Sequence, residues 1–158
     1  MKGVEILNMY IEACDIHAEH VSYAQDFLGD ILPLNLENLR NLSKNQIAHL
    51  DQLIYRFTKL QDTIGRKIFP LMLGLLGEEI GDNTFIDKLN KLEKIGALEN
   101  KQFWQDLRGT RNLISHEYPE EKELILEAIN KCMIDATRLL QYWEYLKQFI
   151  DKRVMQSL

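Results

Sequence analysis

The chain has 158 residues, of which 46% are hydrophobic and 27% charged, values typical of a globular domain with its own core. A formal net charge of −5 argues against a general attraction of the whole molecule to nucleic acids or anionic lipids, so any anion site has to be local. The two cysteines, Cys14 and Cys132, supply neither a disulfide framework nor a zinc motif. We therefore predict a single domain over residues 1–158.

Hydrophobic residues between positions 4 and 28 recur at alternating steps of three and four, which predicts a long first helix. The first residues include acidic side chains throughout and lack the continuous apolar stretch of a secretory signal. No apolar run in the sequence approaches the length of a transmembrane helix. We expect a cytoplasmic protein without a membrane partner.

Residues 30–43 contain Pro33 and several asparagines, so they are predicted to form a connection with about one short turn of structure. From Leu50 to Ile64 the spacing by three and four returns and predicts a second long helix. Because a proline removes a helical hydrogen bond, we expect this helix to be kinked or broken between Gly65 and Pro70.

Polar residues mark the starts of two shorter helices. Residues 82–84 offer a capping side chain for a third helix, and Asn100 can cap a fourth. In the fourth helix Phe103, Leu107 and Ile114 fall within about 40° of one another on a helical wheel. These three residues are therefore predicted to form its buried face.

The fourth helix is predicted to end near His116, because Pro119 disfavours helical geometry before it and suits the start of a new helix. From there to Ile150 hydrophobic residues alternate strictly by four and three, which predicts a long final helix. The fold class is therefore predicted to be all-α, an up-and-down bundle of about five helices. Such bundles serve many functions, so the function has to be argued from a site.

The end of the fourth helix is rich in residue types that carry out catalysis. On a straight helix Asn112 and His116 share one face, and Arg108 lies about 80° from His116. Arg111 lies about 140° from His116, so a straight helix does not bring the two together. Two arrangements would do so: fraying of the helix at Ser115 and His116, or pairing of two chains around a shared groove.

Arg111, His116 and Tyr118 form an R-x4-H-x-Y motif. The motif and its place at the end of the penultimate long helix resemble the HEPN family, and the match is best between Arg108 and Pro119. More loosely, residues 55–70 are similar to the second helix of toxin-type HEPN proteins that are encoded beside a minimal nucleotidyltransferase.

The resemblance implies a metal-independent endoribonuclease that acts as a homodimer without a cofactor and is the toxin of a toxin–antitoxin pair. It implies that His116 is the general acid or base of RNA cleavage and that Arg111 stabilises the scissile phosphate. Tyr118 would orient RNA and accept AMP from the nucleotidyltransferase antitoxin, which would neutralise the toxin. No DNA partner is expected.

Three further residues are predicted to assist RNA binding. Asn112 occupies the polar position after the motif arginine, and Ser115 precedes the motif histidine. Arg108 is predicted to be an auxiliary phosphate contact because of its position on the helix relative to His116. The aromatic side chains that could stack on bases are Trp104, Tyr142, Trp143 and Tyr145, although Trp143 lies on the final hydrophobic seam.

Two alternatives remain open. The domain is also compatible with a non-catalytic substrate-binding or scaffold subunit of a nucleotidyltransferase, because acidic residues between 117 and 123 surround the motif. His17 and His20 share a helix face near Asp15, an arrangement that a metal could use. A di-iron bundle requires a Glu-x-x-His pair on a second helix, which this sequence lacks, so we expect a solvated face and no metal.

Overall fold

The computed structural model describes residues 2–78, 84–116 and 121–157 and, over these residues, consists of helices without a strand. The prediction of an all-α bundle is confirmed. In chain order the elements are α1 (Lys2–Leu28), α2 (Leu36–Arg40), α3 (Lys44–Thr63), the π-helical η1 (Ile64–Ile68), α4 (Phe69–Leu75), α5 (Phe85–Lys94), α6 (Lys101–Ile114), α7 (Lys122–Ile150) and the π-helical η2 (Asp151–Met155).

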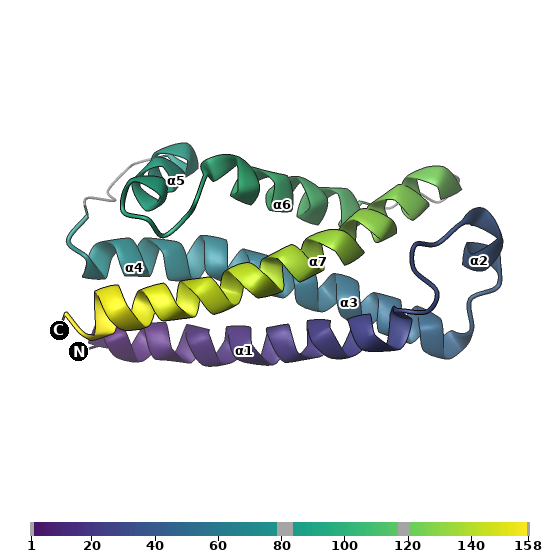
Figure 1. The fold of residues 1–158 in the computed structure, drawn as a ribbon, viewed down its shortest axis with the longest axis horizontal. Coiled ribbons are helices and arrows are strands. Elements are labelled where there is room, and N and C mark those ends of the chain that lie inside the picture. Colours follow the sequence, from purple (N-terminus) through teal and green to yellow (C-terminus); the bar gives the residue numbers. More distant parts are fainter. Residues whose placement is uncertain (1, 79–83, 117–120, 158) are drawn as a thin grey trace.

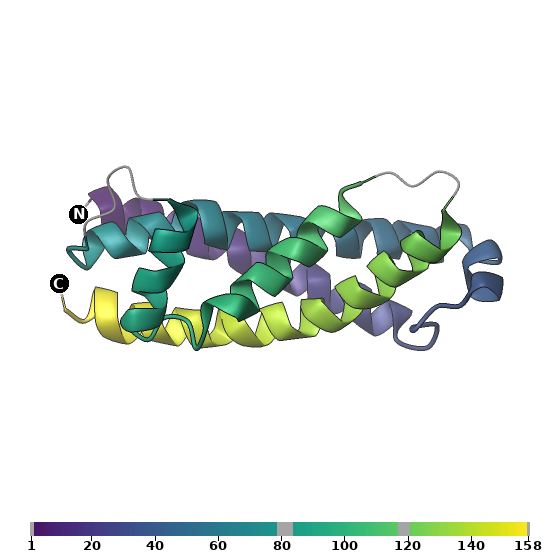
Figure 2. The ribbon, with the colours of Figure 1, turned by 90° about the horizontal axis from the view of Figure 1, so that it is seen from above.

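The long helices run alternately up and down the long axis of the molecule (Figure 1). Helices α1 and α7 and the continuous segment from α3 to α4 lie side by side, and α5 and α6 cover one side of this layer (Figure 2). Both chain ends lie at the same end of the bundle (Figure 1). Helix α6, which carries Arg111 and is called the motif helix below, packs on α3 and α7, so its neighbours come from both halves of the chain.

The first helix packs through a regular seam. Its fully buried residues include four that are spaced by seven, namely Leu7, Cys14, Val21 and Leu28, as a helix against a long helical neighbour requires. Burial, and to a smaller extent the negative charge of the neighbouring Asp15, raise the pKa of the Cys14 thiol to about 12. Cys14 is therefore a small core residue and not a nucleophile.

The interruption predicted between Gly65 and Pro70 takes the form of the π-helical segment η1 and not of a break. The N–H of Phe69 donates to the carbonyl of Ile64, which is five residues earlier. Pro70 follows in the first turn of α4, where a missing N–H costs little. The change of hydrogen-bond register thus lets the chain continue as one rod past Pro70.

Local capping fixes the N-terminal ends of α5 and α6 as predicted. The Thr84 hydroxyl accepts from the N–H of Asp87 at 3.2 Å, and the Asp87 carboxylate accepts from the N–H of Thr84, which forms a capping box. Asn100 caps α6 by accepting from the N–H of Phe103 at 2.9 Å. The predicted start of the last helix at Pro119 lies outside the described residues, and α7 is described from Lys122.

The buried face of α6 differs in part from the predicted one. Leu107 is fully buried, whereas Phe103 and Ile114 pack only at the edge of the core. Trp104 is also fully buried, so the prediction that it is available to stack on bases is wrong. Its indole ring packs against Phe69, with the ring centroids 4.7 Å apart.

None of the described helices has the length and hydrophobicity needed to span a membrane.

Candidate functional site

The motif histidine lies just beyond the end of α6. The helix ends at Ile114, and the hydroxyl of Ser115 donates to the carbonyl of Asn112 at 2.9 Å. His116 follows with an exposed side chain. The angle computed for a straight helix therefore does not apply between His116 and Arg111. Tyr118 lies outside the described residues.

Arg111 points from α6 towards α3 and is held there by Asp62. The Nε and Nη2 atoms of Arg111 donate to the two carboxylate oxygens of Asp62, both at 2.9 Å. Each of these side chains is 23% exposed. The hydrogen bonds to Asp62 raise the pKa of the Arg111 guanidinium. The bidentate pair uses two of the five N–H groups and fixes the plane of the guanidinium.

A cavity of about 120 Å³ lies where α3, η1, α5 and α6 meet. It is lined by the predicted residues Arg108, Arg111 and Asn112, together with Asp62 and Arg66. The guanidinium of Arg108 lies over the ring of Phe85, 4.2 Å from its centroid. The structure thus brings three of the predicted site residues together at one small cavity. Ser115 and His116 follow on the same segment but do not line it.

Asp62 and Arg66 lie on the facing helical segment and were not predicted as site residues from the sequence. No local motif marks them as site residues. A weak signal was present, because Asp62 and Arg66 are four residues apart around Gly65, on one face of the segment that carries the looser family resemblance.

A buried polar contact fixes α6 against α7 next to Arg111. The hydroxyl of Thr110 donates to the carboxylate of Asp135, and both residues are buried. Arg138 donates to the other oxygen of that carboxylate at 2.9 Å. Because an unpaired buried carboxylate is costly, this arrangement holds the motif helix in one rotation about its axis.

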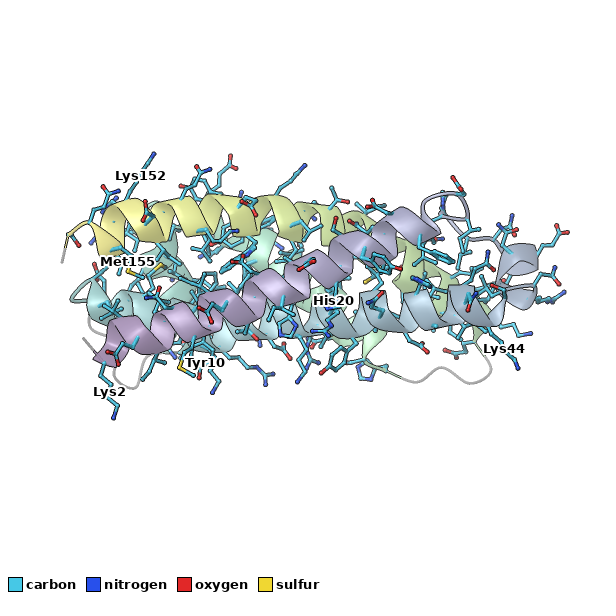
Figure 3. All side chains as sticks on the ribbon, turned by 90° about the horizontal axis from the view of Figure 1, so that it is seen from below. Lys2, Tyr10, His20, Lys44, Lys152 and Met155 are labelled. Carbon is cyan, nitrogen blue, oxygen red and sulfur yellow. The ribbon has the colours of Figure 1, made fainter. Side chains whose placement is uncertain are left out.

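His17 and His20 were predicted to lie on a solvated face. In the structure both are half-buried against α3. The Nη1 atom of Arg56 lies 3.0 Å from Nδ1 of His17, and Nε2 of Gln52 lies 3.0 Å from Nδ1 of His20. Figure 3 shows His20 where α1 and α3 run together. Burial, and then the positive charge of Arg56, lower the pKa of His17. A cationic neighbour also disfavours a bound metal ion.

Within the described ranges, no three His, Cys, Asp or Glu side chains come together as metal ligands.

The pairing of Arg111 with Asp62 can be measured through stability. Replacing either residue with alanine is expected to lower the free energy of unfolding by about 1 kcal/mol, because the pair is bidentate and largely shielded from water. Replacing both is expected to cost less than the sum of the single changes, with a coupling of about 0.5 to 1 kcal/mol in urea unfolding. Purely additive effects would contradict the assigned pairing.

No family model, curated protein or solved structure matches the chain. The HEPN resemblance accordingly depends on the R-x4-H-x-Y motif and on the order of the helices around it.

Proposed function

We propose that this protein is a metal-independent endoribonuclease, the cytoplasmic toxin of a HEPN-type toxin–antitoxin pair. The observation that carries the proposal is the R-x4-H-x-Y motif, whose histidine is exposed directly after α6 and whose arginine is oriented by a carboxylate on α3. Exposure gives an imidazole access to a large substrate, and orientation is what a phosphate-binding guanidinium requires.

The proposed chemistry is an internal transesterification of RNA. The ribose 2′-oxygen attacks the phosphorus while its proton passes to a base, and the bond to the 5′-oxygen breaks as that oxygen gains a proton. The products are a 2′,3′-cyclic phosphate and a 5′-hydroxyl. His116 serves as the base or the acid, since imidazole can do both near neutral pH. Arg111 stabilises the additional negative charge on the phosphate oxygens.

The proposal includes two partners. A second copy of the chain would complete the groove, which accords with the second arrangement considered for Arg111 and His116. A nucleotidyltransferase antitoxin would transfer AMP to Tyr118, two residues after His116 in the sequence. The added adenylate would bring bulk and negative charge to the place where RNA binds, and so stop cleavage.

The test is cleavage of a single-stranded RNA by the purified protein in excess EDTA. We expect fragments that end in cyclic phosphates, because no step requires a divalent cation. Arg111→Ala should abolish cleavage, and Arg40→Gln, which removes an exposed arginine of α2, should not. Cleavage that persists in Arg111→Ala would assign the activity to another site or to a contaminant.

A second candidate function is a non-catalytic subunit that presents a substrate to a nucleotidyltransferase. The observation in its favour is that Asp62 already neutralises Arg111 and that Glu121 and Glu123 expose acidic groups where α7 begins. Such a subunit would leave growth unaffected when expressed alone. Growth arrest that His116→Ala relieves would exclude this candidate and support the nuclease.

A further inference from the structure

Arginines predominate among the charged residues that the structure describes around the cavity beside Arg111, although the chain as a whole is acidic. Of the described residues that line it, Arg66, Arg108 and Arg111 are basic and Asp62 is acidic. The Asp62 carboxylate already accepts both hydrogen bonds of Arg111. An anion in the cavity would therefore face Arg66 and Arg108 and the remaining N–H groups of Arg111.

A buried hydrogen-bond donor borders the same cavity. Trp104 is fully buried, and its indole Nε1 has no hydrogen-bond partner among the described residues. The atom faces Gly65, since a Cβ built on that glycine would lie 3.4 Å from Nε1, and both residues line the cavity. A buried donor left without an acceptor carries a free-energy cost, because it has lost its hydrogen bond to water. A ligand oxygen in the cavity would remove that cost.

The size of the cavity restricts the ligand. Its volume of about 120 Å³ is well below the roughly 300 Å³ at which pockets for larger organic ligands begin. This volume suits a tetrahedral oxyanion and is small for a base with its sugar. An oxyanion also offers acceptors in several directions, which suits donors that converge from α6 and η1.

We propose that this cavity binds a phosphate group, with the Trp104 indole N–H as a buried donor and Arg66 and Arg108 as its additional cationic contacts. Asn112 also lines the cavity and lies four residues before His116 in the sequence. The inference deepens the proposed function by naming a phosphate contact site for RNA. The anion site itself depends only on the cavity and its donors.

The experiment follows the two indole N–H signals by NMR while inorganic phosphate is added to the intact protein. The chain has two tryptophans, and Trp143 is an internal control because its Nε1 donates to Asp15 at 2.9 Å. We expect the Trp104 signal to move and saturate and the Trp143 signal to stay. Equal movement of both signals, or no movement at all, would overturn the proposal.

Variants identify the cationic contacts. Arg66→Gln and Arg108→Gln should each weaken phosphate binding about tenfold, because each removes a charge-assisted hydrogen bond. Arg40→Gln removes the same charge from α2, far along the sequence, and should bind as the wild type does. Unchanged affinity in both Arg66→Gln and Arg108→Gln would contradict the assignment, provided that their thermal unfolding shows a native fold.

A short 2′-O-methyl RNA distinguishes a phosphate of an RNA strand from a free phosphate, since it cannot be cleaved. If it moves the Trp104 signal and competes with inorganic phosphate, the site serves RNA, and if only inorganic phosphate acts, the site serves a small anion. Failure of RNA cleavage with an intact titration would reject the nuclease and keep the phosphate site. Cleavage with a flat titration would reject the phosphate site alone.

Discussion

Replacing His116 with glutamine is expected to lower the rate of RNA cleavage by about 10²- to 10⁴-fold, the usual contribution of a positioned general acid or base. Glutamine keeps a polar side chain of similar length but cannot exchange a proton near neutral pH. Because the side chain is exposed after the end of α6, the change should leave the fold intact. The loss should appear in kcat, with a smaller effect on KM.

The matched control is His49→Gln. The chain has four histidines, and His49, which is not part of the motif, stacks on Phe27 of α1 with a centroid distance of 3.6 Å. Single-turnover cleavage of a labelled RNA in EDTA would give both rates. A His116→Gln protein that cleaves as fast as the His49→Gln protein would remove the motif histidine from the mechanism.

The fold was predictable where local chemistry determines it. The caps at Thr84 and Asn100 are satisfied by backbone groups three residues away, so the sequence is sufficient to locate them. The π-helical segment η1 was not predictable in the same way. There Gly65 is packed against the indole of Trp104, such that an added Cβ would lie 3.1 Å from the ring, and this contact joins residues far apart in the chain.

Only the residues that α6 contributes to the candidate site were predictable from the sequence. Arg108, Arg111 and Asn112 were predicted from the motif and from helical geometry, and they line one cavity. Asp62 contacts Arg111 across 49 positions of sequence, and no local pattern reports such a contact. The helical wheel also failed beyond Ile114, because it assumes that the helix continues.

Trp104→Ala is expected to lower the free energy of unfolding by about 3 to 5 kcal/mol, the range found when large buried aromatic residues are truncated. The side chain is fully buried, and its ring centroid lies 4.7 Å from that of Phe69 and 5.8 Å from that of Tyr142. Since Gly65 carries no side chain that could refill the space, the cavity would persist in the variant.

Thermal unfolding measures the effect of Trp104→Ala, with a midpoint expected to fall by roughly 6 to 20 °C for a chain of this length. Tyr145→Ala is the control, since Tyr145 is 49% exposed and was an equal candidate for base stacking from sequence alone. Its replacement should cost no more than about 1 kcal/mol. A Trp104→Ala protein that unfolded within a few degrees of the wild type would contradict the burial of this side chain. The core of α6 would then be assigned wrongly.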